Sequence, residues 1–258
     1  MTGRIHPSAL ISPGATIGEN VEIGAFAMVG DDCVIGDGCV IAARATLERH
    51  VILGRNVKIG VGTVLGSDPQ DLKFKGERTT VEIGDNTVVR EYSTINRGTS
   101  QSFKTSVGAN CFIMSYVHLA HDCHIGEGVV LANMVQLAGH VTVEARVILS
   151  GVTAVHQFTR IGRNAIVGGC SRVSKDVPPF VKAVGNPMKL YGLNSIGLRR
   201  NGFSPETILE LKRAYRLLFR SELNLAQALE RIASEVDQVP EVKQLVQFVE
   251  SSQRGVAI

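Results

Sequence analysis

The sequence has few cysteines, no long apolar run and little net charge. Its five cysteines form no Cys-x-x-Cys pair, so neither a disulfide framework nor a zinc ribbon is indicated. No stretch of 18 apolar residues is present, which argues against a membrane-spanning helix. The first ten residues, MTGRIHPSAL, lack the apolar core of a signal peptide. A net charge of +3 over 258 residues argues against nucleic acid as the main partner. We therefore expect a cytoplasmic enzyme or binding protein.

Aliphatic residues recur at every sixth position of most of the chain. Counting in steps of six from Ile5 to Val173 gives 29 frame positions, and 26 of them hold Ile, Leu or Val. The exceptions are Asp71, Glu77 and Gln101. A period of six fits neither an amphipathic helix nor an ordinary strand. It predicts a β-solenoid of triangular cross-section, in which three hexads make one coil of 18 residues.

Each hexad is expected to be a short strand followed by a corner. One large aliphatic residue and a small residue two positions earlier should face inward. Four cysteines hold this small position and are expected to be buried thiols. They are Cys33, Cys39, Cys111 and Cys123. Glycine often follows the frame position, as at Gly60 and Gly126, where we expect unusual backbone dihedral angles. Residues 18 apart should stack at about 4.8 Å.

Two segments interrupt the frame and are predicted to be loops. Residues 66–80 would bury two charged side chains if they stayed in the coil, which is costly without partners. Residues 97–105 would likewise bury a glutamine, and they predict a second, shorter loop. Loops on a rigid scaffold often carry binding residues, so Asp71, Lys73 and Lys75 are candidates. A solvated charge cluster is the alternative.

The frame ends before the last third of the chain. The Pro- and Gly-rich segment KDVPPFVKAVGNPMKLYGLN is predicted to be a linker that leaves the solenoid. Three amphipathic helices should follow, starting at Pro205, after Asn224 and at Pro240. We therefore expect a solenoid over residues 1–190 and a helical domain over residues 191–258. So small a helical domain should pack on the solenoid or on neighbouring subunits.

Polar side chains gather at one corner of the predicted solenoid. They stand one to three residues past frame positions in three successive coils, so the 18-residue step places them together. They are His121, Asp122, Gly139, His140, His156 and Gln157. All are expected to face outward, where packing gives no reason for histidines, an acid and an amide. A structural hydrogen-bonded ladder is the non-functional alternative.

Two chemistries suit this corner. Three histidines with an open fourth position can hold zinc, as in the carbonic anhydrases built on a left-handed β-helix. Here, however, His118, His121 and His124 are spaced by three, unlike the H-x4-H pair of those enzymes. Alternatively, the neutral His121 imidazole is a general base oriented by Asp122, with the Gly139 N–H directed at an oxyanion. No serine or cysteine in a triad context is evident, which favours direct transfer without a covalent intermediate.

Eight stretches of the sequence carry a resemblance to a known family. They are QDLKFKGERTTVEIG, VHLAHDCHIG, LAGHVTV, SGVTAVHQF, VGGCS, DVPPF, GLNSIGLRR and NGFS. Over its whole length the chain resembles the UDP-N-acetylglucosamine O-acyltransferases that begin lipid A biosynthesis. The resemblance implies an all-β, single-stranded left-handed parallel β-helix with a C-terminal α-helical domain, assembled as a homotrimer. It also implies transfer of an (R)-3-hydroxyacyl chain from acyl carrier protein to the glucosamine 3-OH of UDP-N-acetylglucosamine.

The resemblance assigns roles to the corner residues. It implies that His121 is the general base, that Asp122 orients it and that Gly139 donates the oxyanion-hole N–H. The residues implied to contact substrate are Asp71, Lys73, His118, His140, His156, Gln157, Gly169, Asn194 and Arg200. The phosphopantetheine of acyl carrier protein is the implied acyl donor, and neither a metal nor another cofactor is implied.

Several of these assignments carry a location. Asp71 and Lys73 would reach the sugar and phosphate region from the adjacent chain. Asn194 and Arg200 would meet the nucleotide, and Gly169 would lie along the acyl groove.

The chain departs from the family pattern at three positions. Ile196 stands where many members have an acid, Asn201 where a second arginine is expected and Asn96 where histidine is expected. The acyl length and the choice between a hydroxyl and a 3-amino acceptor sugar stay open. A zinc-dependent lyase of the carbonic anhydrase type, or a trimeric scaffold with structural histidines, is the alternative of another class.

Overall fold

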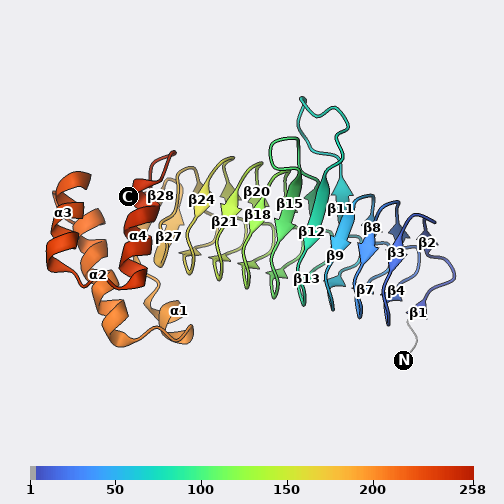
Figure 1. The fold of residues 1–258 in the computed structure, drawn as a ribbon, viewed down its shortest axis with the longest axis horizontal. Coiled ribbons are helices and arrows are strands. Elements are labelled where there is room, and N and C mark those ends of the chain that lie inside the picture. Colours follow the sequence, from blue (N-terminus) through green and yellow to red (C-terminus); the bar gives the residue numbers. More distant parts are fainter. Residues whose placement is uncertain (1–3) are drawn as a thin grey trace.

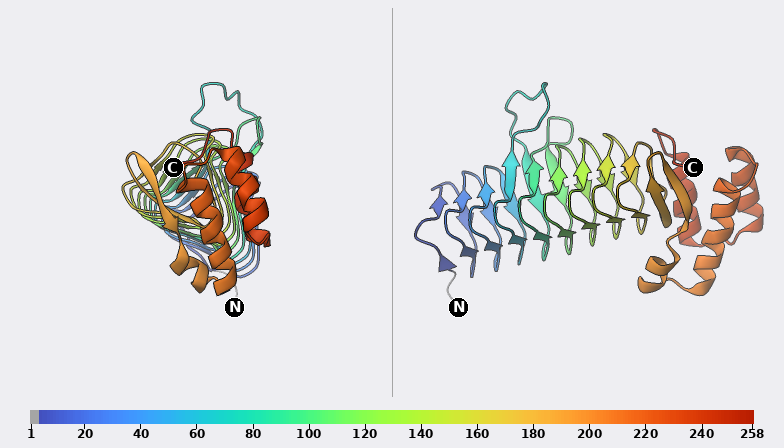
Figure 2. Two further views of the ribbon diagram at one scale, coloured as in Figure 1. Left: turned by 90° about the vertical axis from the view of Figure 1, so that its left-hand side faces the viewer. Right: turned by 180° about the vertical axis from the view of Figure 1, so that it is seen from behind.

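The hexads form short strands that stack into three parallel sheets along one axis (Figure 1). The computed structural model describes residues 4–258. Strands three apart in the chain are neighbours in a sheet. In β1 and β4, for example, Ile5 pairs with Ile23, the predicted step of 18 residues. The end-on view in Figure 2 shows the triangular outline of the prism, and the predicted parallel β-helix is confirmed.

The three sheets, which we name A, B and C, follow one another around each coil. Sheet A contains β1 (Arg4–Ile5), β4 (Glu22–Ile23), β7 (Val40–Ile41), β10 (Lys58–Ile59), β13 (Val88–Val89), β16 (Phe112–Ile113), β19 (Val130–Leu131), β22 (Ile148–Leu149), β25 (Ile166–Val167), β27 (Val181–Gly185) and β28 (Met188–Leu193). Sheet B contains β2 (Leu10–Ile11), β5 (Met28–Val29), β8 (Thr46–Leu47), β11 (Val64–Ser67), β14 (Thr94–Asn96), β17 (His118–Leu119), β20 (Gln136–Leu137), β23 (Ala154–Val155) and β26 (Arg172–Val173). Sheet C contains β3 (Thr16–Ile17), β6 (Val34–Ile35), β9 (Val51–Leu53), β12 (Thr80–Ile83), β15 (Lys104–Val107), β18 (His124–Ile125), β21 (Thr142–Val143) and β24 (Arg160–Ile161).

The aliphatic frame fills the interior of the prism. Every frame residue that holds Ile, Leu or Val from Ile23 to Val173 is buried. Ile5, Ile11 and Ile17 are partly or half exposed because they form the first coil, at the end of the stack. The four cysteines predicted to be core thiols are buried, whereas Cys170 is exposed.

Glycine after the frame position serves a close approach between coils. A Cβ built on Gly126 would lie 2.6 Å from the Ala145 backbone nitrogen, and one on Gly60 would lie 2.6 Å from that of Glu91. The prediction of unusual dihedral angles at these glycines is wrong, since neither has a positive φ. The left-handed residue is instead the one three past the frame position, as at His140 with φ 62°.

These left-handed residues form one column along each corner. The AB corner, between sheets A and B, carries Tyr92, Tyr116, Met134, Val152 and Cys170. The BC corner carries Asp122, His140 and Phe158, and the CA corner carries Asn86, Asn110, Arg146 and Asn164. The sequence therefore gives each corner its own chemistry: mostly apolar, catalytic in type and mostly amide.

Both predicted loops are confirmed, and both leave the prism at the BC corner. Residues 68–79 connect β11 to β12, and residues 97–103 connect β14 to β15. β11 and β14 are neighbours in sheet B, so the loops emerge from adjacent coils. Figure 1 shows them side by side on one edge of the prism.

The segment after the frame differs from the predicted linker. Its Val181–Gly185 strand pairs with β25 in parallel, and β28 folds back on β27 as an antiparallel strand. The Pro- and Gly-rich segment thus covers the last coil instead of leaving it. Pro178 and Pro179 precede β27, where they interrupt no sheet hydrogen bond.

Four helices follow at the C-terminal end of the prism (Figure 2). They are α1 (Ser195–Arg200), α2 (Pro205–Phe219), α3 (Leu225–Glu235) and α4 (Pro240–Glu250). The predicted caps are confirmed, because the Ser204 and Asn224 side chains accept hydrogen bonds from the first turns of α2 and α3. Helix α1 was not predicted, since six residues are too few for a helical pattern. No helix within residues 4–258 has the length and hydropathy to cross a membrane.

The coil spacing generates a stability prediction. Gly126→Ala would press its Cβ against the backbone of the next coil, and such overpacking typically costs about 1–3 kcal/mol of unfolding free energy. Gly151→Ala is the matched control, because its nearest heavy atom would lie 3.2 Å away. Urea unfolding of both variants measures the difference. Equal stabilities would contradict the proposed role of the glycine.

Candidate active site

A histidine–aspartate pair lies at the BC corner. The side chain of His121 is 12% exposed, and its Nδ1 lies 2.8 Å from Asp122 Oδ2. A carboxylate can only accept a hydrogen bond, so Nδ1 carries the proton. In the neutral imidazole, Nε2 then presents a free lone pair. This is the arrangement expected of a general base.

Asp122 does not face solvent as predicted, because the 97–103 loop covers it. The aspartate is 1% exposed. Thr99 donates to its carboxylate through both its backbone N–H, at 3.0 Å, and its hydroxyl, at 2.8 Å. Ser102 donates through its hydroxyl and, at 3.3 Å, its N–H. Sequence reasoning recognised the loop but missed these two residues, whose contacts cross between coils of unequal length.

The donors around Asp122 keep it ionised. Burial on its own raises the pKa of the carboxyl group, but the hydrogen bonds from Ser102, His121 and Thr99 outweigh it and lower the pKa to about 2. A charged carboxylate beside Nδ1 fixes the tautomer and orientation of His121. It also stabilises the imidazolium that forms when Nε2 takes a proton.

Gly139 lies directly beside the His121 ring. A Cβ at position 139 would be 2.6 Å from the ring Cε1 and 2.8 Å from Nε2. Any side chain there would therefore displace the imidazole. Glycine brings its backbone, including the N–H, against the reactive nitrogen. The prediction that position 139 needs a glycine thus gains a steric reason.

His140 and Phe158 continue the column above Asp122. The His140 ring meets His121 edge-on at 4.9 Å and stacks on Phe158 at 4.3 Å with an interplanar angle of 3°. Burial is the main cause that lowers the pKa of His140, partly opposed by Asp122, so this ring is neutral at pH 7. Phe158 was not predicted as a site residue. The 18-residue step from His140 could have found it.

The other histidines occupy different surfaces. His118 lies on sheet B, where its Nδ1 is 2.7 Å from the Thr94 hydroxyl, and burial lowers its pKa. His124 lies on sheet C, with Nδ1 2.9 Å from the Ser106 hydroxyl. His156 is exposed near the corner, and its Nδ1 donates to the Gln157 carbonyl at 3.1 Å. The structure thus places His156 and Gln157 beside the cluster and His124 outside it.

The longer loop lies by the catalytic corner of its own chain. It leaves from the same corner as His121, and the Asp71 carboxylate acts to raise the pKa of His140. Asp71 Oδ1 accepts the backbone N–H of Lys73 at 2.9 Å, which shapes the turn. The sequence-based expectation assigned these two residues to an adjacent chain's site. The topology instead favours the site of the same chain.

Asn194 and Arg200 lie elsewhere on the chain. Asn194 caps α1, and its amide donates at 3.0 Å to the carbonyl of Asn164, in the CA corner. Arg200 is exposed at the end of α1. Figure 1 shows α1 across the axis from the two loops. Gly169 lies at the AB corner, so the structure brings none of these three residues to His121 of the same chain.

A metal has one group of potential ligands within residues 4–258. His121, Asp122 and His140 have donor atoms within 4.8 Å of one another. However, His121 Nδ1 and the Asp122 carboxylate are already paired with each other, and Thr99 and Ser102 occupy the carboxylate further. A site of three histidines, which the zinc alternative requires, does not form in the described part of the chain.

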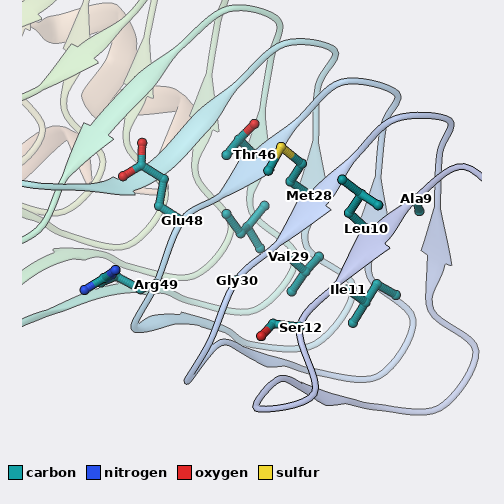
Figure 3. A pocket seen from close by; sticks show the side chains of 11 residues that line it. Ala9, Leu10, Ile11, Ser12, Met28, Val29, Gly30, Thr46, Glu48 and Arg49 are labelled. Carbon is teal, nitrogen blue, oxygen red and sulfur yellow. The ribbon is translucent and has the colours of Figure 1, made fainter.

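A hollow of about 610 Å³ on the outer face of sheet B lies away from this cluster (Figure 3). Its lining is mostly apolar, with Leu10 and Met28 on neighbouring strands and only Glu48 and Arg49 charged. These residues offer no nucleophile paired with a base. Chemistry therefore concentrates at the BC corner.

Comparison with known proteins identifies the family. Residues 176–257 match the model of the "Udp N-acetylglucosamine O-acyltransferase; Domain 2" family, and residues 14–49, 32–67 and 104–139 match bacterial transferase hexapeptide repeats. The acyl-[acyl-carrier-protein]–UDP-N-acetylglucosamine O-acyltransferase of Gloeothece citriformis is 47% identical over 74% of this chain and 69% of that protein. The chain belongs to the UDP-N-acetylglucosamine O-acyltransferase family. The relative from Herminiimonas arsenicoxydans is 46% identical over 74% of this chain and 75% of that protein.

Solved structures of the same acyltransferase family match the whole chain. The UDP-N-acetylglucosamine acyltransferase of Bacteroides fragilis has a TM-score of 0.97 and 43% identity, covering 99% of this chain and 100% of that one. The structure from Acinetobacter baumannii has a TM-score of 0.95 and 39% identity, covering 98% and 99%. The fold is thus the left-handed parallel β-helix with a C-terminal helical region.

The buried aspartate generates a pH prediction. Its folded-state pKa lies below the ordinary value of 3.8, so the ionised carboxylate stabilises the fold above that value. This stabilisation is lost as the pH falls through about 2. Asp122→Asn should therefore lower the unfolding free energy at pH 7, and its difference from the unmodified protein should shrink below about pH 4. Urea unfolding at pH 7, 4 and 3 tests this, and a pH-independent difference would refute it.

Proposed function

We propose that the chain transfers an (R)-3-hydroxyacyl group from acyl carrier protein to the 3-OH of the glucosamine in UDP-N-acetylglucosamine, the first step of lipid A biosynthesis. It does so as a cytoplasmic homotrimer. Family membership over nearly the whole chain supports this reaction. The observation that carries the mechanism is His121, with Nδ1 held by Asp122 and Nε2 against Gly139.

In the proposed step, His121 Nε2 takes the proton of the sugar 3-OH as that oxygen attacks the thioester carbonyl carbon. A hydroxyl is a weak nucleophile at neutral pH without such a base. The carbonyl oxygen becomes an oxyanion, to which the Gly139 N–H donates. The carbon–sulfur bond then breaks, and the phosphopantetheine sulfur takes the proton from the imidazolium. The products are the O-acyl sugar and the free thiol, and no other cofactor takes part.

Substrate contacts come from two chains in this proposal. Asp71 and Lys73 serve the site of their own chain, since their loop leaves at the same corner as His121. Asn194, Arg200 and Gly169 flank sheet A on the CA and AB sides. They therefore serve the site of a neighbour whose catalytic corner lies against sheet A. His118, His140, His156 and Gln157 complete the substrate contacts from the catalytic chain.

The surface chemistry of sheet A supports such a neighbour. Its outer face presents Phe112, Val130, Ile148 and Ile166 from successive strands. The adjoining AB corner exposes Tyr92 and Tyr116, stacked at 5.6 Å, followed by Met134 and Val152. A continuous apolar surface of this kind is typical of a protein–protein interface or a ligand groove. Packing against the next subunit would bury it and leave a groove for the acyl chain.

Removing the proposed base tests the mechanism. His121→Ala should lower kcat by roughly a hundredfold to ten-thousandfold, the usual contribution of a positioned general base. The matched control is His124→Ala, because His124 is also partly buried yet lies on sheet C. Rates with UDP-N-acetylglucosamine and an acyl carrier protein thioester give the answer. A near-native rate for His121→Ala in a folded trimer would exclude this role.

Mixed trimers test the division of the site between chains. His121→Ala and Arg200→Ala variants should regain activity after subunit exchange, because one chain supplies the base and its neighbour the arginine. His121→Ala and Lys73→Ala variants should not, because both residues serve the same chain's site. Mass spectrometry verifies the exchange. Recovery only in the second mixture would reverse the assignment of the loop.

The acyl groove generates a prediction for chain length. A Cβ on Gly169 would touch only the Gly151 carbonyl at 3.2 Å and Ser150, so a longer side chain would project outward without disturbing the core. We expect a preference for a long donor, of about 14 carbons by family resemblance. Each buried CH₂ contributes about 0.8 kcal/mol, so Gly169→Met should shift the preference to a shorter donor. The ratio of rates for long and short donors is the readout, and an unchanged ratio would remove Gly169 from the groove.

A further inference from the structure

Arg97 is a buried cation that the proposed mechanism does not use. Its side chain is 4% exposed at the start of the shorter loop. A buried guanidinium requires partners for its N–H groups. Those partners therefore show what the residue holds in place.

All of these partners belong to the longer loop or its two ends. Nε donates to the Gly66 carbonyl at 3.1 Å, before the loop leaves the prism. Nη1 lies 3.4 Å from both the Glu77 carbonyl and the Thr79 hydroxyl, where the loop returns. Nη2 forms an ion pair with Asp68. A single planar group thus ties the outgoing and returning strands of the loop together.

The guanidinium also reaches the middle of the loop. It lies over the Phe74 ring at 5.5 Å, and Phe74 in turn donates its N–H to the Asp71 carbonyl at 3.0 Å. This chain of contacts runs from Arg97 to the segment that carries Asp71 and Lys73. Two residues beyond Arg97, Thr99 binds the carboxylate of Asp122. The same short segment therefore fixes the loop on one side and the catalytic pair on the other.

We propose that Arg97 is a positioning residue that sets the longer loop relative to the catalytic corner. It acts through Asp71 and Lys73, which are the groups that touch substrate, so this role rests on the proposed function. Losing Arg97 should loosen the loop while the His121–Asp122 pair stays intact. Substrate binding should then weaken much more than the chemical step.

The first experiment measures the loop itself, without reference to activity. Chymotrypsin cleavage after Leu72 or Phe74 reports how often the loop leaves its seat. Arg97→Gln should accelerate this cleavage by about tenfold, the equivalent of one charge-assisted hydrogen bond, and Arg97→Lys should fall between. Lys104→Gln is the control, because it removes a surface ion pair with Glu82 nearby. Equal cleavage rates in folded Arg97→Gln and Lys104→Gln would overturn the proposal.

The second experiment is kinetic. Arg97→Gln should raise the KM for UDP-N-acetylglucosamine by about tenfold and change kcat by less than about threefold. In a Lys73→Ala background, the same substitution should have little further effect on KM, because the two residues act as one unit. A fall in kcat at unchanged KM, or fully additive effects, would contradict positioning through the loop.

The two readouts separate this role from the proposed function. Faster cleavage with an unchanged KM would mean that Arg97 holds a loop that does not bind substrate, which overturns both the role of Asp71 and Lys73 and that of Arg97 in the reaction. Where Arg97→Gln does not fold, Asp68→Asn replaces it. The Asp68 side chain is 70% exposed, so this variant removes the loop-side partner without touching the core. It should accelerate cleavage in the same direction, and an unchanged rate would refute the proposal.

Discussion

The close stacking of one coil on the next is the constraint on which the rest of the structure depends. Backbone hydrogen bonds join consecutive coils in all three sheets, and an aliphatic side chain fills the interior at each frame position. This spacing leaves room only for glycine where a corner touches the backbone above, as at Gly126. It also forces a left-handed residue at each corner. Side chains of many kinds accept that conformation here because the sheets on both sides hold the corner.

A catalytic pair built on such a corner needs little reorganisation. His121 and Asp122 are consecutive residues, and Asp122 itself holds the left-handed position with φ 58°. The coil below supplies the shorter loop that covers the carboxylate, and the coil above supplies Gly139 against the imidazole. Three coils therefore fix one base before substrate binds. Preorganisation of this type keeps the cost of orienting the base out of the chemical step.

Much of the fold followed from the sequence because a single period governs it. The frame located the interior residues, the two loops and the stacking of His121 with Gly139. The strands after residue 173 escaped it, since β27 and β28 are held by pairing with β25 and with each other. The burial of Asp122 also escaped, because Thr99 and Ser102 reach it from a loop whose shape no period describes. The family resemblance named the substrate residues, but only the topology showed from which corner each one starts.

The lengths of the two loops have a consequence for how the prism can change. Thr80 resumes pairing in sheet C so that Val81 lies beside Val51, a step of 30 residues, and Lys104 lies beside Thr80, a step of 24. These steps exceed the ordinary 18 by 12 and by 6, which are two hexads and one hexad. Whole hexads have thus left the wall while the wall closed behind them in phase. A corner of this solenoid can accept new surface in units of six residues, and a recognition loop can grow there without any renumbering of the core.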